Sequence, residues 1–197
     1  MSVRIYVEGG GDNKDTIKRC NEGFASYCQK LTPPNRSPRI VACGGRDRAF
    51  DRFRTAVQNA QPGETYVLLV DAEAPLNAAS PVQHLQDRDG WSFPALSHHR
   101  AFLMVQAMEA WFLADREMLA AFYDGGFLAS SLPGNINIEA IPKDDLEPKL
   151  KRASKPTQKG EYHKTRHGFD LLGKINSVKV ENASPHAASF NKFLRGL

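Results

Sequence analysis

The sequence predicts an α/β fold in which helices flank a mainly parallel, four-stranded sheet of the Rossmann-like kind. Three observations predict this class: short apolar strands alternate with segments of helical periodicity, glycine-rich turns separate them, and two strands end in acidic residues. Strands that alternate with helices favour parallel pairing through right-handed crossovers. Ligands gather at the carboxyl ends of such strands, so we expect the functional site there.

The composition is that of an ordinary globular protein. The 197 residues are 41% hydrophobic and 24% charged, and a chain of this length can bury a substantial core. No apolar run approaches the roughly 20 residues that span a bilayer. No basic-then-apolar signal segment is present, which predicts a cytoplasmic protein. Three irregularly spaced cysteines suit neither a disulfide framework nor a zinc knuckle. We expect Cys20 and Cys28, eight apart on one face of a helix, to be buried.

The charge is unevenly distributed along the chain. Residues 1–142 hold 14 Lys and Arg against 16 Asp and Glu, whereas residues 143–197 hold 12 against 6. An acidic part followed by a basic part suits a polyanionic partner, although a solvated lysine-rich surface explains the charge equally well. We therefore expect an α/β domain over residues 1–123 and a basic, mostly helical C-terminal extension over residues 124–197, packed on it.

The first half of the chain gives the clearest periodicity. Glycines follow Glu8 and permit a tight turn, and Asp12 or Asn13 can cap the helix that comes next. Thr32-Pro33-Pro34 and Pro62-Gly63 end helices, as proline and glycine commonly do. The expected elements are a strand over 3–7, a helix over 14–31, a strand over 39–43, a helix over 47–60 and a strand over 65–70.

The second half is less regular. Residues 76–100 lack clear periodicity and predict a long loop across the mouth of the site. Substrate contacts by its His84, Trp91, His98 or His99 are possible, but packed side chains are the better interpretation. The remaining expected elements are a strand over 101–105, a helix over 106–122, an irregular stretch over 124–142, a helix over 143–152, a basic linker over 155–160, and two short helices over 167–175 and 185–194.

Three carboxylates follow two of the predicted strands. Glu8 ends the first strand, and Asp71 and Glu73 end the apolar strand Val67-Leu68-Leu69-Val70. Carboxylates held together in a cleft repel one another unless a divalent cation neutralises them. All-oxygen ligands favour Mg²⁺ or Mn²⁺, which bind phosphate and assist its transfer. The alternative is that each acid caps a helix or pairs with Arg46 or Arg48.

This pattern resembles the TOPRIM domain, the metal-dependent module of topoisomerases, bacterial primases, the overcoming-lysogenization-defect nucleases and small RNA-maturation nucleases. In that domain a glutamate follows the first strand and an Asp-x-Asp follows a later one. Here the second motif is Asp71-Ala72-Glu73, which keeps the carboxylate on a longer arm. The resemblance implies a TOPRIM-like sheet and a metal-dependent reaction on phosphodiesters. We expect neither strand passage nor priming, because the chain has no room for a strand-passage domain or a separate zinc-binding domain.

A closer resemblance covers nearly the whole chain. Glu8-Gly9-Gly10, Asp71-Ala72-Glu73, the block from Gln106 to Asp115 (QAMEAWFLAD) and Tyr162-His163-Lys164 resemble a bacterial TOPRIM-like family of unknown function. The Gln-x-x-Glu-x-Trp block is its most specific part. Because its members are often encoded beside an ATPase, the resemblance implies an ATPase partner and a role in phage defence.

The resemblance also implies roles for individual residues. Glu8 is then a general acid/base or a metal ligand, and Asp71 and Glu73 are metal ligands. Glu109 opens the helix after the fourth strand and can point into the same cleft, although an acid there is also favoured by the helix dipole. The other expected roles are catalysis by Lys14 and contact with substrate by Asp12, Arg46, Tyr162 and Lys164.

Other motifs are weaker. The glycine turn after Glu8 lacks the Gly-Lys-Ser/Thr of a Walker loop and does not follow the dinucleotide fingerprint. His163 and His167 lie four apart, but no cysteine or acid is placed to complete a zinc site with them.

Three functions follow as expectations. The leading one is a Mg²⁺- or Mn²⁺-dependent nuclease or phosphotransferase that acts on nucleic acid. The first alternative is a non-catalytic subunit that binds an ATPase or nucleic acid. The second is a small-molecule phosphatase that uses the same acids.

Overall fold

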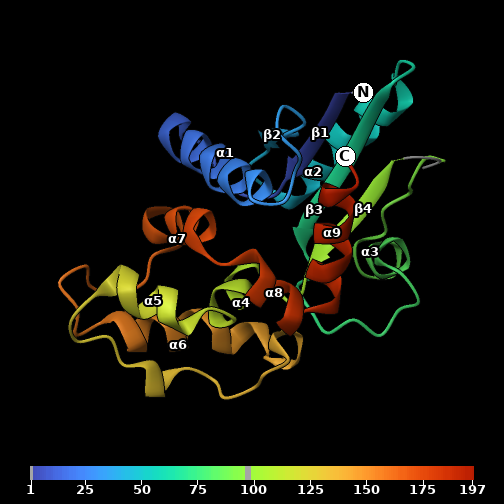
Figure 1. The fold of residues 1–197 in the computed structure, drawn as a ribbon. Helices are drawn as coiled ribbons and strands as arrows, with labels where there is room; N and C mark the ends of the chain where they lie inside the picture. Colours follow the sequence, from blue (N-terminus) through green and yellow to red (C-terminus); the bar gives the residue numbers. More distant parts are fainter. Residues whose placement is uncertain (1, 96–98) are drawn as a thin grey trace.

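One four-stranded parallel sheet forms the centre of the protein (Figure 1). The structure, a computed structural model, describes residues 2–95 and 99–197. The strand order is β2-β1-β3-β4, so the expected α/β, Rossmann-like class with a parallel four-stranded sheet is confirmed. The strands are β1 (Ser2–Val7), β2 (Arg39–Ala42), β3 (Glu64–Asp71) and β4 (Arg100–Met104).

The strand order places the two acid-ended strands side by side. β1 pairs with β3 in parallel, with Val7 opposite Leu69, and β3 continues for two further residues to Asp71. Asp71 itself pairs with Met104 of β4. Since parallel neighbours end at the same edge of a sheet, the residues that follow β1 and β3 meet there.

Helices cover both faces of the sheet. Side chains alternate along a strand, so Ile5 and Val7 enter one core, while Tyr6 enters the other. The first face is covered by α1 (Lys14–Gln29), α7 (Phe169–Lys174) and α9 (Pro185–Arg195); the second is covered by α2 (Arg46–Gln58) and α3 (Pro81–Asp89).

The C-terminal part shares its core with the sheet. Phe169, Leu172 and Phe190 belong to the same buried cluster as Ile5 and Val67. The C-terminal segment therefore packs on the sheet through one shared core. Its elements and those just before it are α4 (Met108–Leu113), α5 (Arg116–Tyr123), two 3₁₀ turns (Ala129–Ser131 and Ile138–Ala140), α6 (Lys143–Ser154), a π-helical turn (Lys164–Gly168) and α8 (Ser177–Ala183).

Three sequence-based expectations of secondary structure were wrong. The expected loop over 76–100 contains α3, which Ser80 caps by accepting a hydrogen bond from the Gln83 N–H and which Gly90 ends in a left-handed conformation. The helix expected over 106–122 is two helices, because Asp115 accepts a hydrogen bond from the Met118 N–H and starts the second. The third error is α8, which lies in a stretch where no helix was expected.

Of the four candidates for substrate contact in residues 76–100, the three that the structure describes are buried, which agrees with the interpretation as packed side chains. His84 Nε2 lies 2.8 Å from the Ala72 carbonyl oxygen, and His99 Nδ1 accepts a hydrogen bond from the Tyr66 N–H. Trp91 stacks on Phe50, with ring centroids 4.4 Å apart. The fourth candidate of this stretch, His98, lies outside the described residues.

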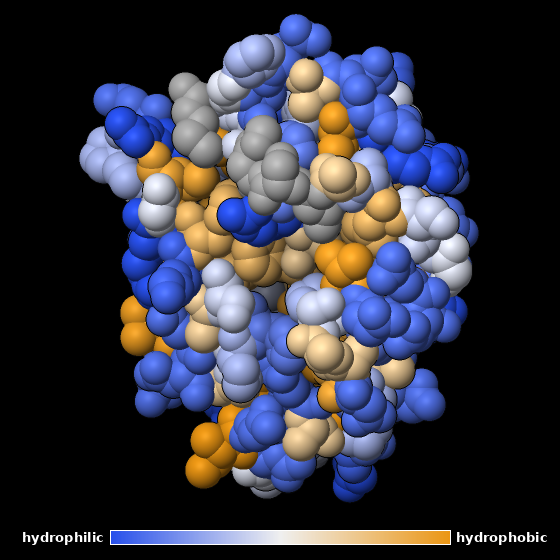
Figure 2. All heavy atoms as spheres, turned by 90° about the vertical axis from the view of Figure 1, so that its right-hand side faces the viewer, coloured by the Kyte–Doolittle hydropathy of each residue, from blue (hydrophilic) through white to orange (hydrophobic). Residues whose placement is uncertain are grey.

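The surface agrees with the composition. The face that carries α3 and α9 is mostly hydrophilic, with hydrophobic side chains only in small groups (Figure 2). Among the described residues, no helix is both long and apolar enough to cross a bilayer. Cys20 and Cys28 are buried free thiols, as expected, and Cys43 is buried as well.

Candidate metal centre

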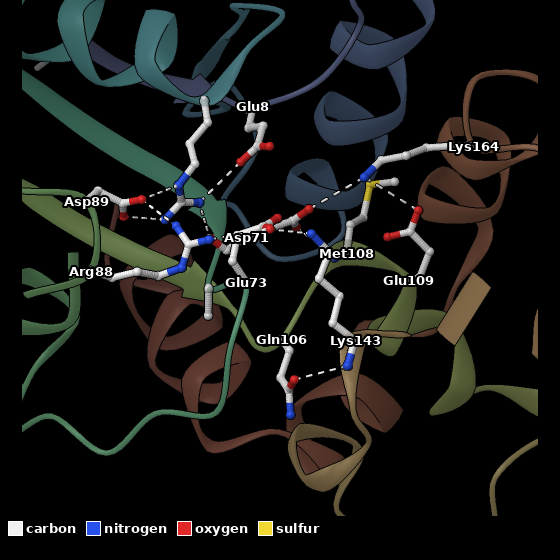
Figure 3. A network of polar contacts seen from close by, with 12 residues as sticks. Glu8, Asp71, Glu73, Arg88, Asp89, Gln106, Met108, Glu109, Lys143 and Lys164 are labelled. Carbon is white, nitrogen blue, oxygen red and sulfur yellow. Dashed lines mark hydrogen bonds and ion pairs between the residues drawn. The ribbon is translucent and has the colours of Figure 1, made fainter. Parts of the chain in front are cut away.

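The three strand-end carboxylates meet at the carboxyl edge of the sheet (Figure 3). Glu8 follows β1, Asp71 is the last residue of β3, and Glu73 comes two residues later. One oxygen from each lies within 4.8 Å of the other two. Within residues 2–95 and 99–197, no other group of three or more His, Cys, Asp and Glu is this close. The sequence therefore identified the cluster correctly.

The backbone beyond β3 explains how Asp71 and Glu73 share one side. Ala72, between them, is fully buried in the core on the α2–α3 face. Glu73 adopts a left-handed conformation with φ 68°, and its N–H donates to the Gln106 carbonyl oxygen at 2.7 Å. A left-handed glutamate is strained, and the bond to the segment after β4 helps to hold it. The turn brings the Glu73 carboxylate back beside Asp71.

The glycine turn frees Glu8 at the end of β1. Gly9 and Gly44 exchange backbone hydrogen bonds of 2.8 and 2.9 Å, which ties the turn to the end of β2. Gly10 has φ 87°, and a Cβ atom there would lie 3.0 Å from the Cα of Ile17 in α1. Only glycine fits this conformation and this contact without strain. The turn therefore packs under α1 and leaves Glu8 facing β3.

Arg46 connects the cluster to α3. Its guanidinium forms an ion pair with Glu8 at 3.4 Å and a second one with Asp89 at 2.7 Å, and it also donates to the Asp71 carbonyl oxygen. Its guanidinium carbon lies 5.0 Å from the centre of the Trp91 ring. Arg46 therefore does pair with one of the acids, as the alternative interpretation expected. It also lies where a substrate oxygen beside Glu8 would be within reach.

Two further cations pair with Glu73. The Lys143 ammonium, from the first residue of α6, forms an ion pair with it, and an Arg88 guanidinium nitrogen lies 3.7 Å from it. The Gln106 side-chain oxygen accepts a hydrogen bond from the Lys143 N–H at 3.0 Å. Sequence reasoning missed Lys143 and Arg88. Gln106 alone had a signal, because it opens the Gln-x-x-Glu-x-Trp block.

A second polar group borders Asp71 on its other side. Asp71 Oδ1 accepts a hydrogen bond from the Met108 N–H at 2.7 Å, and Asp71 Oδ2 lies 3.5 Å from the Lys164 ammonium. That ammonium also lies 3.6 Å from a Glu109 oxygen, which accepts a hydrogen bond from the Tyr162 hydroxyl at 2.9 Å. Glu109 therefore reaches the ammonium that borders Asp71, and Tyr162, which is 1% exposed, holds Glu109 by this hydrogen bond.

Burial controls the acid–base properties of this edge. It raises the pKa of Asp71 to about 7, against the opposing effect of Lys164. It also raises the pKa of Glu8, although Arg46 opposes this change. Burial by itself lowers the pKa of Lys164, but Asp71 and Glu109 outweigh it and raise that pKa. The carboxylates are therefore short of compensating positive charge in spite of their cationic neighbours.

A small pocket opens beside the cluster. Its volume is about 200 Å³, and its walls include the glycine turn, Glu8, Asp71, Lys164, Thr165 and Phe169. Lys14 is exposed at the first residue of α1 and does not border this pocket. Asp12 is exposed as well and pairs with Arg48 at 2.7 Å. The structure therefore brings Glu109, Arg46 and Lys164 to the acidic cluster, but leaves Lys14 and Asp12 outside it.

The donor set fits a hard divalent cation. The three carboxylate oxygens lie within 4.8 Å of one another, while two ligands on opposite sides of a Mg²⁺ ion, each at roughly 2.1 Å, lie about 4.2 Å apart. Small rotations of the side chains therefore suffice for Glu8, Asp71 and Glu73 to share one ion. The absence of sulfur and imidazole from this group favours Mg²⁺ or Mn²⁺ over zinc.

Comparison with known proteins gives one family. Residues 7–197 match the sequence profile of a domain of unknown function, DUF4276. The chain belongs to the DUF4276 family. No curated protein and no solved structure matches it. The family match covers nearly the whole chain, from the end of β1 to the last residue, so it includes both the sheet edge and the C-terminal segment that supplies Lys164.

Proposed function

We propose that this protein is a Mg²⁺- or Mn²⁺-dependent enzyme of the TOPRIM type that cleaves or transfers nucleic acid phosphodiesters. The observation that carries the proposal is the cluster of Glu8, Asp71 and Glu73 at the carboxyl edge of a parallel sheet. The order of these acids along the chain, one after the first strand and two after a later one, is that of the TOPRIM pattern.

The charge of the network supports a divalent ion and a phosphate together. Five carboxylates (Glu8, Asp71, Glu73, Asp89 and Glu109) contact four cationic side chains (Arg46, Arg88, Lys143 and Lys164). The formal charge of this network is therefore −1. A divalent cation changes it to +1, and one phosphodiester with a single negative charge then balances it. Figure 3 shows how these side chains converge on the cluster.

The size of the pocket favours a polymer over a small molecule. Pockets that enclose a whole small ligand usually measure about 300–1,000 Å³, whereas this pocket holds about 200 Å³. It can receive a phosphate group and the atoms beside it, but the remainder of a substrate must lie outside. The excess of Lys and Arg over residues 143–197 provides positive charge for a polyanionic backbone.

Each group then has a chemical role. A divalent ion held by Glu8, Asp71 and Glu73 supplies Lewis-acid stabilisation of the developing negative charge. Glu8 would be either a ligand of this ion or the group that accepts a proton from the attacking water. Arg46 and Lys164 lie on either side of the carboxylates and can hold phosphate oxygens. An ATPase partner and a role in phage defence remain part of the proposal through the family resemblance alone.

The test is cleavage of single- and double-stranded DNA and RNA in the presence of Mg²⁺ or Mn²⁺, with mononucleotides screened in parallel. Wild type, Glu8→Gln and Asp71→Asn are compared. We expect cleavage of a polymer by wild type only, and loss of that cleavage on chelation. Equal activity in all three proteins would refute the proposal. Hydrolysis restricted to mononucleotides would support the small-molecule phosphatase instead.

A further inference from the structure

The position of Lys164 is unusual for a lysine. Its ammonium lies between two buried carboxylates, 3.5 Å from Asp71 Oδ2 and 3.6 Å from Glu109 Oε1. The side chains of these two acids are only 3% and 5% exposed. The lysine comes from the π-helical turn Lys164–Gly168, more than ninety residues after Asp71 in the chain. Figure 3 shows its side chain reaching toward Asp71 and Glu109.

Both carboxylates are fixed by other groups. The Met108 N–H donates to Asp71 at 2.7 Å, and the Tyr162 hydroxyl donates to Glu109 at 2.9 Å. Asp71 therefore faces the ammonium with its other oxygen, Oδ2, and Glu109 faces it with Oε1, the oxygen that also accepts from Tyr162. Two buried carboxylates that share one cation are the arrangement that would otherwise hold a metal ion.

Asp71 thus has a cation position on each of two sides. On one side it belongs to the Glu8–Asp71–Glu73 cluster, and on the other it shares Lys164 with Glu109. Two-metal phosphoryl-transfer sites place their ions roughly 3.5–4 Å apart, on either side of the reacting phosphate. The second of these positions is filled here by a side chain of the protein.

We infer that the centre binds a single divalent ion and that the Lys164 ammonium takes the place of a second one. The inference rests on the proposed function, because it requires that Glu8, Asp71 and Glu73 bind the first ion. A tethered ammonium balances one unit of charge and can contact a phosphate oxygen in the adjoining pocket. It does not dissociate, so the centre needs one ion from solution instead of two.

The experiment counts ions. Mn²⁺ is titrated into the full-length protein, and the number bound per chain is measured by isothermal calorimetry and by the paramagnetic resonance signal of free Mn²⁺. We expect one ion for wild type and one for Lys164→Arg, which keeps the cation. Lys164→Ala empties the position between Asp71 and Glu109, and we expect two ions. Adding Glu109→Gln to Lys164→Ala should restore one.

Lys179 provides a control in which one of the two acids is buried and the other is exposed, at 6% and 88% exposure. Its ammonium also lies between two carboxylates, 2.8 Å from Asp115 and 2.7 Å from Glu117, but at the start of α5 and remote from the sheet edge. Lys179→Ala should still bind one ion. Two ions in this variant would mean that any lysine removed from between two acids creates a site, and would overturn the inference.

The outcomes separate the two proposals. Two ions in wild type overturn the inference and leave the proposed function standing. No ion in wild type overturns the proposed function, and the inference with it. One ion in both wild type and Lys164→Ala, with a cooperative thermal transition in each, overturns the inference that the Lys164 ammonium takes the place of a second ion. If Lys164→Ala fails to fold, Lys164→Gln keeps most of the side-chain length without the charge and takes its place in the comparison.

Discussion

Asp71 is a buried carboxylate and Glu139 is a half-buried one, and their surroundings differ. Glu139 accepts hydrogen bonds from the Ser184 hydroxyl and the His186 N–H, and its other oxygen lies 2.9 Å from His186 Nδ1. Burial raises the pKa of Glu139, but these hydrogen bonds outweigh it, and the pKa ends below its usual value. Asp71 has the Met108 N–H and a more distant ammonium, and its pKa rises to about 7.

The difference separates an acid that the protein satisfies with its own donors from one that is a candidate for binding. The protein satisfies Glu139 with its own donors, so the carboxylate needs nothing further and fixes the start of α9. Asp71 and Glu8 are buried without enough positive charge, and their environment disfavours the ionised form. Strongly perturbed carboxylates in a cleft are candidates for binding and catalysis. Each prediction below tests this contrast.

The largest expected effect is on activity. Asp71→Asn removes the negative charge of a proposed metal ligand. We expect the Mg²⁺-dependent cleavage rate to fall by about a thousandfold or more, which is equivalent to several kcal/mol of transition-state stabilisation. Glu139→Gln should cleave at nearly the wild-type rate. Single-turnover cleavage of the preferred polymer measures both. A comparable loss in the two variants would abolish the distinction.

The next effect is on the pH dependence of stability without metal. Because the folded-state pKa of Asp71 is raised to about 7 from 3.8, the folded protein binds more protons than the unfolded chain between these values. Stability is therefore lost as the pH rises through this window, by up to about 4 kcal/mol. Asp71→Asn has no carboxyl group to titrate, so its free energy of unfolding should increase relative to that of wild type between pH 4 and 7. Urea unfolding in EDTA measures the difference, and a constant difference would contradict the assignment.

A smaller effect comes from metal binding. At a Mn²⁺ concentration about 100 times its Kd, binding to the folded state adds about 2.7 kcal/mol. For a chain of this size that corresponds to a rise in Tm of about 5–10 °C. Wild type and Glu139→Gln should both show the rise, and Asp71→Asn should not. Thermal scans with and without Mn²⁺ measure this change in Tm, and the buffers contain no Ca²⁺, which would compete for the carboxylates.

The smallest expected effect is structural. Glu139→Gln weakens the hydrogen bonds that hold the start of α9, and we expect a loss of about 1–3 kcal/mol near neutral pH. Because the folded-state pKa of Glu139 is lowered, its contribution is present above the unfolded-state pKa and disappears as the pH falls through the folded-state value. The deficit should thus shrink in acid, opposite to the trend for Asp71→Asn. Urea unfolding at several pH values checks the sign.

Local patterns predicted most of the sheet and the core of the site. Val67-Leu68-Leu69-Val70 followed by Asp71 is a buried strand with an acid at its end, and the alternation of strands and helices implies parallel pairing. The α3 helix also had signals, Ser80-Pro81 at its start and Gly90 at its end, but it has a weak apolar face. The break before α5 depends on Asp115, which caps this helix. Its carboxylate also accepts hydrogen bonds from the Lys179 ammonium and the Asn176 N–H, which lie far along the chain.

By itself, the sequence determined which carboxylates lie at strand ends, because strand length and the following turn are local properties. Only the tertiary structure decided which cations surround them. Lys143, Arg88 and Lys164 come from three separate segments, and each meets its acid through packing between helices and the sheet. The left-handed Glu73 likewise depends on a hydrogen bond to the segment after β4. Contacts between segments far apart in the sequence leave no periodic pattern in a single chain. The burial and the spacing of residues along one strand do leave such a pattern.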